Sequence, residues 1–111
     1  MKKIEAIITP FKLDAVQEAL RHAGLNRMTV SEVKSADGSD SGRRFYRGAE
    51  FVVDFLPKIK IELLVADDQV GTCAEVIEQT GKNGRIDAEI SVSTIEDIIR
   101  IRTGEHGVDA I

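Results

Sequence analysis

The stretch VKSADGSDSGRRFYRGAEFVVDFLPKIKIELLV, residues 33–65, decides the fold of this chain. Its last part, residues 58–65, alternates between two sets of side chains. The first set is entirely apolar and consists of Ile59, Ile61, Leu63 and Val65. The second set is mostly charged and consists of Lys58, Lys60, Glu62 and Leu64. A period of two is typical of a β-strand, so residues 58–65 predict a strand with one firmly apolar face.

A long connection precedes this strand. The β-branched run at residues 28–34 predicts a partner strand, and roughly two dozen residues separate the two strands, whereas a hairpin connection has only about two to five. The connection begins with the polar KSADGSDSG, residues 34–42, and continues with RRFYRGAEF, residues 43–51, which carries three arginines and three aromatic residues. Since connections of this length are usually either functional or disordered, we interpret it as the surface through which the protein acts.

The N-terminal part of the chain predicts a strand followed by a helix. Residues 3–8 are mostly apolar and end before Pro10, which cannot donate a hydrogen bond to a sheet. Residues 12–22 have the spacing of an amphipathic helix, and Gly24 supplies its end. The apolar face of this helix consists of Leu13, Val16, Ala19, Leu20 and Ala23.

A second helix is predicted to begin at Asp67. An aspartate is a favourable N-cap, and the charge of Asp68 suits the first turn of a helix. The buried stripe of this helix consists of Val70, Cys73, Ala74 and Ile77. The glycine-rich TGKNG, residues 80–84, predicts a turn after it.

The C-terminal part predicts one more strand, at residues 89–93. Its two apolar residues, Ile90 and Val92, share one face. Residues 95–99 fit neither a helix nor a strand clearly. Residues 100–102 are expected to be extended, and residues 103–111 to form a tail.

The order strand-helix-strand-strand-helix-strand predicts an α+β, ferredoxin-like sandwich. The 111 residues form a single domain, residues 1–111, with the long loop at about residues 35–57. Two helices can cover only one face of a four-stranded sheet. The face that carries Lys58 and Glu62 must therefore meet water or another subunit, and a domain this small often forms an oligomer.

Composition narrows the possible functions. A net charge of −4 argues against a nucleic-acid partner. The single cysteine, Cys73, excludes a disulfide within the chain and fits a reducing compartment. The start MKKIEAII does not resemble a signal peptide, and no apolar run approaches the roughly 20 residues that cross a membrane. We therefore expect a cytoplasmic protein without membrane insertion. No cluster of Asp or Glu residues at ligand spacing surrounds His22 or His106, so no metal site is expected.

Four stretches together carry a resemblance to a known family. They are MKKIEAIITPFKLDAVQEAL at 1–20, MTVSEVK at 28–34, FYRGAEFVVDFLPKIKIELLV at 45–65 and IRIRTGE at 99–105. They resemble the PII family of nitrogen-regulatory signalling proteins over nearly the whole chain. The resemblance implies a homotrimer of ferredoxin-like subunits, with nucleotide sites at the subunit clefts where ATP and ADP compete. It also implies that the long connection is the T-loop, which docks on membrane transporters, regulatory enzymes and other regulators.

The resemblance also implies which residues are functional. The nucleotide-binding set consists of Ile7, Thr29, Lys58, Glu62, Leu64, Arg100 and Arg102. Within it, Thr29, Glu62 and Leu64 fall where the family holds adenine, and the two arginines resemble its phosphate-binding arginines. The partner-docking set consists of Arg43, Arg44, Tyr46 and Arg47. From the residues alone, the arginines of the first set could form a solvated strand face, Lys58 could be a cross-strand partner, and the docking set could be a charged loop tip.

Two departures from the family pattern lie in the T-loop. In nitrogen-sensing members the uridylylated tyrosine ends the motif YRGAEY, whereas here Phe51 ends it and offers no hydroxyl to modify. Gly38 and Ser39 stand where the family usually has an arginine for phosphate and a glutamine that helps to hold Mg²⁺ and 2-oxoglutarate. Lys58 resembles the lysine that pairs with the oxoglutarate carboxylate. One cation without the metal anchor argues against strong binding of 2-oxoglutarate and Mg²⁺.

The third departure is in the family's phosphate loop, which is close to T-x-x-x-G-K-I-G-D-G-K-I. The corresponding segment here is one residue shorter and lacks both later glycines. It consists of Arg85, Ile86, Asp87, Ala88 and Glu89. Glu89 stands about where the family has a lysine, and its carboxylate would repel phosphate. The adenine pocket therefore looks retained and the grip on a triphosphate weakened, which favours ADP or AMP over MgATP.

Our main interpretation is a signal-transduction protein that binds an adenine nucleotide and regulates a transporter, enzyme or regulator through the T-loop, in nitrogen regulation. The alternative is a reassigned sensor of ADP or AMP in another transport or carbon pathway, without a 2-oxoglutarate response or uridylylation. An enzyme is not expected, because no nucleophile motif, phosphate-binding G-x-x-x-x-G-K-[ST] loop or carboxylate pair is recognisable. An RNA-recognition motif shares the element order, but it stacks bases on strand aromatics, which the predicted third and fourth strands lack.

Overall fold

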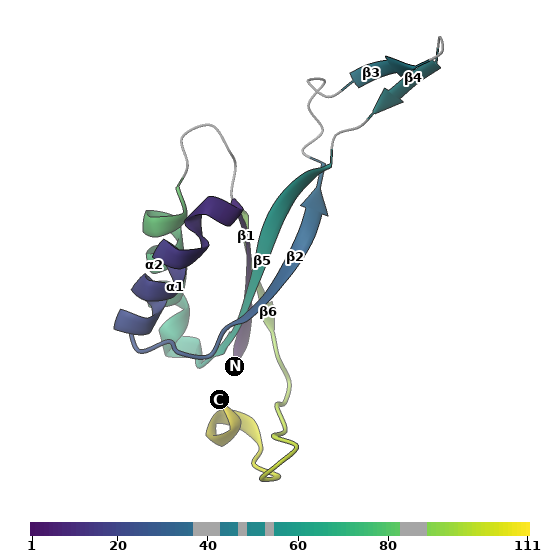
Figure 1. Ribbon diagram of the computed structural model, residues 1–111. Helices are drawn as coiled ribbons and strands as arrows, with labels where there is room; N and C mark the ends of the chain where they lie inside the picture. The colour runs from purple at the N-terminus through teal and green to yellow at the C-terminus, as the bar shows by residue number, and fades with distance from the viewer. Residues whose placement is uncertain (37–42, 47–48, 53–54, 83–88) are drawn as a thin grey trace.

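The computed structural model describes residues 1–36, 43–46, 49–52, 55–82 and 89–111. Two helices pack against one face of a four-stranded sheet (Figure 1). The sheet consists of β1 (Lys2–Ile8), β2 (Thr29–Ser35), β5 (Leu56–Val65) and β6 (Glu89–Thr94). Its strand order is β2-β5-β1-β6, and each neighbouring pair is antiparallel. This arrangement confirms the predicted α+β, ferredoxin-like fold.

The core lies between the helices and the two central strands. Alternate residues of β1 and β5 point toward the helices, and nearly all of them are buried. They are Ile4, Ala6, Ile8, Ile59, Ile61, Leu63 and Val65. The predicted strand at residues 58–65 is confirmed and begins two residues earlier, at Leu56. Pro57 is tolerated because it lies next to the start of the strand.

The first helix, α1 (Leu13–His22), follows a short 3-10 turn, η1 (Pro10–Lys12). Its Val16 and Leu20 side chains are buried against the sheet. The helix ends as predicted at Gly24, whose φ of 82° is in the left-handed region. The Leu25 amide donates to the Leu20 carbonyl at 2.9 Å and the Gly24 amide to the Arg21 carbonyl at 3.0 Å. This pair of bonds is the Schellman motif, in which glycine adopts the left-handed conformation without steric cost.

The second helix, α2 (Val70–Gly81), buries Cys73 and Ile77 as predicted. Asp67 is not its N-cap, and that prediction is wrong. Ala66 takes the capping position before a 3-10 turn, η3 (Asp67–Gln69), and its amide donates to the Gln69 side chain at 3.1 Å. The Asp67 carboxylate instead accepts a hydrogen bond from the N-terminal ammonium of Met1 at 2.7 Å. A charge-assisted hydrogen bond to the N-terminal ammonium is stronger than one to a neutral backbone amide.

The turn expected at residues 80–84 does not begin at Thr80, and residues 83 and 84 lie outside the described residues. The helix continues through Gly81, and the Thr80 hydroxyl donates to the Val76 carbonyl at 2.7 Å. Gly81 is buried between Ile8 and Val16. Gly81 thus belongs to the helix and not to the turn.

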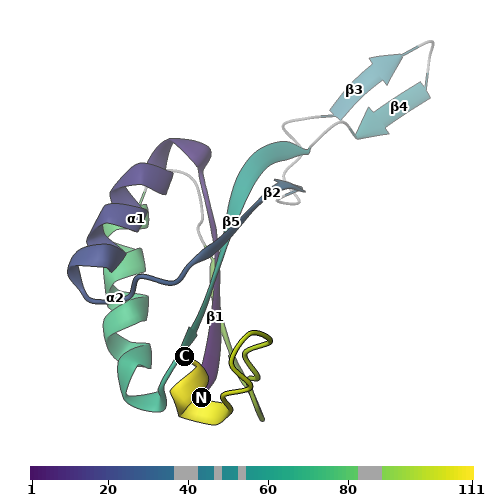
Figure 2. The same cartoon turned by 60° about the horizontal axis from the view of Figure 1, so that its bottom comes forward.

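The segment after β6 folds back on itself and lies beside the end of the sheet (Figure 2). Residues 100–102 are not extended, contrary to the prediction, because residues 101–103 form a turn in which the Gly104 amide donates to the Arg100 carbonyl at 2.8 Å. Ile99 forms an isolated antiparallel bridge with His106. The chain ends in a 3-10 helix, η4 (Gly107–Ala110). The predicted tail is thus a folded segment.

The long connection contains a two-stranded ribbon beyond the ends of β2 and β5 (Figure 1). Its strands are β3 (Arg43–Tyr46) and β4 (Ala49–Val52). Three of the predicted docking residues, Arg43, Arg44 and Tyr46, belong to β3. The fourth, Arg47, and the departures at Gly38 and Ser39 lie outside the described residues, as do residues 85–88. No helix in the described part of the chain is long and apolar enough to cross a membrane.

Candidate functional site

The sheet face opposite the helices is polar along its middle. Antiparallel pairing places Thr29 opposite Glu62, and Glu62 opposite Glu5. Two carboxylates directly opposite each other on one face repel. The Lys3 ammonium offsets this repulsion, since its Nζ lies 2.9 Å from Glu5 Oε1 and 3.7 Å from Glu62 Oε2. Lys60 Nζ adds a second cation 3.7 Å from Glu62 Oε1.

This cluster changes the proton affinities of its members. The hydrogen bond to Glu5 raises the pKa of Lys3, and the attraction of Glu5 and Glu62 adds to the effect. The same hydrogen bond lowers the pKa of Glu5. Lys3 is therefore fully charged at neutral pH and offers a fixed cation on this face.

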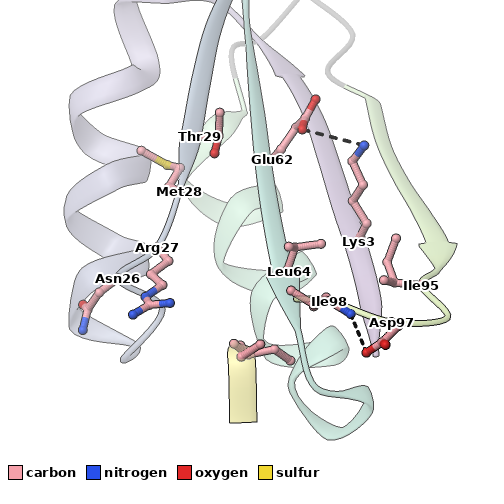
Figure 3. A pocket seen from close by; sticks show the side chains of 12 residues that line it. Lys3, Asn26, Arg27, Met28, Thr29, Glu62, Leu64, Ile95, Asp97 and Ile98 are labelled. Atoms are coloured by element: carbon pink, nitrogen blue, oxygen red, sulfur yellow. Dashed lines mark hydrogen bonds and ion pairs between the residues drawn. The ribbon is translucent and has the colours of Figure 1, made fainter. Parts of the chain in front are cut away.

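A cavity of about 680 Å³ opens at one end of the polar face (Figure 3). Its walls come from the start of β2, the ends of β1 and β5 that meet there, and the folded C-terminal segment. The lining residues are Lys3, Asn26, Arg27, Met28, Thr29, Glu62, Leu64, Ile95, Asp97, Ile98, Ala110 and Ile111. Figure 3 shows the Lys3 side chain reaching toward Glu62, with Leu64 and Ile98 close together below them.

The chemistry of these walls suits a flat, mostly apolar ligand with a few polar groups. Aliphatic side chains, among them Met28, Leu64 and Ile98, can cover the faces of a ring. The Thr29 hydroxyl and the Glu62 carboxylate can pair with polar atoms at its edge, and Lys3 and Arg27 can attract an anionic group. Ligand pockets generally have volumes of about 300–1,000 Å³ and this mixture of surfaces.

The structure brings together three of the seven predicted nucleotide-binding residues, Thr29, Glu62 and Leu64. Ile7 lies on the same sheet face, opposite Lys60 and Glu89. Lys58 lies nearer the start of β5, opposite Val33. Neither Ile7 nor Lys58 lines the cavity of its own chain.

The two predicted phosphate-binding arginines do not line this cavity either. The Arg100 Nε donates to the Ala110 carbonyl at 3.0 Å, and Arg102 is exposed in the turn that follows. Glu89 is exposed at the start of β6, and the rest of the degenerate phosphate loop lies outside the described residues. Within the described part of the chain, no three His, Cys, Asp or Glu side chains gather in a way that could hold a metal ion.

Sequence reasoning missed several residues of the cavity. The sequence pattern places Lys3 only in a strand, and it gives no role to the segments that contain Asp97, Ala110 and Ile111. The pairing of β1 with β5 brings Lys3 beside Glu62, and it would have followed from the predicted strand order. Nothing in the sequence indicates that the C-terminal segment turns back to meet Leu64.

Comparisons with a family model and with individual proteins both lead to the same family. The family model "Nitrogen regulatory protein P-II" matches residues 1–105. The chain is 56% identical to the nitrogen regulatory protein P-II of Rhodospirillum rubrum and 55% identical to that of Mesorhizobium japonicum. It is 53% identical to the nitrogen regulatory protein P-II 1 of Escherichia coli. Each of these alignments spans 112 residues and covers all of both chains.

Proposed function

Because the chain belongs to the nitrogen regulatory protein P-II family, whose members are signalling regulators, we propose that it binds an adenine nucleotide in the cavity beside Thr29, Glu62 and Leu64. Through its T-loop it then passes the nucleotide state to a partner protein, a membrane transporter or a regulatory enzyme. The chemistry of the cavity is the single observation that carries this proposal. Aliphatic walls, one hydroxyl and one carboxylate provide what an adenine ring needs for recognition.

The site is completed by a neighbouring subunit of a homotrimer. The cavity is open on the sheet face that no helix covers, so a second copy of the chain can close it. Arg100 and Arg102 do not line the cavity of their own chain. In our proposal the arginines of a neighbouring copy reach the phosphates across the cleft, where guanidinium groups bind phosphate oxygens in pairs.

A second candidate differs in the nucleotide and in the pathway. It is a sensor of ADP or AMP that does not respond to 2-oxoglutarate and is not uridylylated. Three residues favour this second candidate. Phe51 has no hydroxyl that could be uridylylated, Ser39 is too short to replace a glutamine at a metal, and the charge of Glu89 repels phosphate. Its output would be another transport or carbon pathway.

Calorimetric titration of the purified protein with ATP, ADP and AMP separates these candidates. Each nucleotide is titrated with and without Mg²⁺ and 2-oxoglutarate. Micromolar ATP binding, with 2-oxoglutarate binding only in the presence of MgATP, supports nitrogen regulation of the usual kind. Tighter binding of ADP or AMP, without heat from 2-oxoglutarate, supports the second candidate.

Two matched variants test whether the nucleotide occupies this cavity. Thr29→Val removes a hydroxyl from the cavity wall and keeps the shape of the side chain, so we expect the affinity to fall by about fivefold to tenfold. Thr72→Val makes the same change on the exposed surface of α2 and should leave the affinity unchanged. Equal affinities for both variants, or no heat from any nucleotide with the wild-type protein, would contradict the proposal.

A further inference from the structure

The side chain of Asp97 connects two parts of the C-terminal segment. Its Oδ1 accepts hydrogen bonds from the Ile98 amide at 2.8 Å and from the Gly107 amide at 3.1 Å. Its Oδ2 accepts a hydrogen bond from Nδ1 of His106 at 3.3 Å. One carboxylate therefore joins the start of the segment, at residues 97–98, to the point where η4 begins.

The end of this segment is a wall of the cavity. Ile98 lines the cavity from the first part of the segment, and Ala110 and Ile111 line it from the last part. Asp97 itself also lines the cavity, as does Ile95 (Figure 3). The contacts that hold Gly107 therefore help to set where Ala110 and Ile111 lie relative to Leu64 and Thr29.

Hydrophobic burial contributes little to the folding of this segment. The residues Ile99, Ile101 and Val108 are 59%, 101% and 65% exposed, and of this segment's apolar residues Ala110 is buried, with an exposure of 4%. A segment with few buried apolar contacts opens at a small free-energy cost unless polar contacts hold it. The Asp97 bonds, and the Arg100 bond to the Ala110 carbonyl, are such contacts.

We propose that Asp97 is a positioning residue for the cavity, holding Gly107 and His106 so that Ala110 and Ile111 form its closing wall. Ligand binding and closure of residues 98–111 are then coupled, because the ligand contacts a wall that exists only in the closed arrangement. This inference rests on the proposed nucleotide binding, and the experiment below distinguishes the failure of one from the failure of the other.

Three variants isolate the carboxylate. Asp97→Ala removes all three hydrogen bonds and leaves the Gly107 amide bonded to the Ile98 carbonyl at 2.9 Å, so the fold remains but the segment opens more often. Asp97→Asn keeps a carbonyl oxygen that can accept from both amides. Asp109→Asn removes an exposed carboxylate of the same segment that does not line the cavity, and it serves as the control.

Two measurements are made on each protein. Calorimetry gives the affinity for ADP, and we expect it to fall by about tenfold in Asp97→Ala, by less in Asp97→Asn and not at all in Asp109→Asn. Hydrogen exchange, followed by mass spectrometry, reports on residues 98–111 with and without ADP. We expect faster exchange there in free Asp97→Ala, unchanged exchange in α1 and α2, and strong protection by ADP in the wild type.

The outcomes separate clearly. If the wild type binds ADP and Asp97→Ala binds it equally well, the inference is wrong and the proposed function stands. If Asp97→Ala exchanges faster throughout the whole chain, the residue has a general structural role and the inference is also wrong. If the wild type binds no adenine nucleotide, the proposed function fails, and the positioning role fails with it.

Discussion

Replacing Gly81 by alanine should stabilise this protein, although the residue is a buried glycine. Gly81 is the last residue of α2. A Cβ atom built there would lie 3.5 Å from Ile8 Cγ2, 3.9 Å from Val16 Cγ2 and 4.0 Å from Ile77 Cγ2. These are ordinary van der Waals distances, so the methyl group fits without displacing its neighbours. The backbone is helical and needs no left-handed conformation.

Two favourable effects add at this position. Burying one methyl group contributes about 0.8 kcal/mol. Alanine loses less backbone entropy than glycine in a helix, which contributes about 0.5 kcal/mol at the end of a helix, where the propensity difference is only partly expressed. We therefore expect the free energy of unfolding to rise by about 1 kcal/mol.

Two other glycines are matched controls. Gly71 lies in the first turn of α2, and a Cβ there meets nothing within 4 Å, so Gly71→Ala should gain about 0.5 kcal/mol from helix propensity alone. Gly24→Ala should cost about 1 kcal/mol, because the residue has a φ of 82° in the Schellman motif. Urea unfolding at one fixed protein concentration measures all three, since the stability of an oligomer depends on concentration. A loss of stability in Gly81→Ala would refute the packing described here.

Three further predictions follow from single features of the chain. Burial raises the pKa of Cys73 to about 11. A disulfide reagent that reacts with thiolates should therefore modify the folded protein at pH 8 at least about a hundredfold more slowly than the unfolded protein. Comparable rates would place the thiol outside the core. The hydrogen bond from His106, with that from the Ile98 amide, lowers the pKa of Asp97 in the folded protein. The stability that Asp97 contributes to the folded segment is therefore complete above the ordinary carboxyl pKa of about 3.9, and it is lost as the pH falls through the lower folded pKa. Protection of residues 98–111 from hydrogen exchange, corrected for the intrinsic rate, should thus be constant between pH 7 and 5 and fall below about pH 4; a fall already at pH 6 would point to a different group. Light scattering should give three times the chain mass of 12.2 kDa, and a monomer would leave the proposed cleft incomplete.

The sequence alone determined the elements whose pattern is local. A period of two predicts β5 because alternate side chains of a strand face opposite sides, and the helical spacing before Gly24 predicts α1 and its end. The order of these elements then limits the sheet to a ferredoxin-like arrangement. Family resemblance identified Thr29, Glu62 and Leu64, three residues that the structure places in one cavity.

Tertiary structure decided the features that depend on residues far apart in the chain. Aspartate is a favourable N-cap residue, so the local sequence predicts that Asp67 caps the second helix. The pairing of β1 with β5 brings the ammonium of Met1 within hydrogen-bond distance of the Asp67 carboxylate, and no local pattern shows this. The sequence predicts that Arg100 and Arg102 lie on an extended segment. The hydrogen bond from the Gly104 amide to the Arg100 carbonyl instead closes a turn over residues 101–103. The cavity is lined by Lys3, Leu64 and Ile111, which come from the two ends of the chain and its middle. No local sequence pattern encodes such a meeting, because it depends on how the whole sheet assembles.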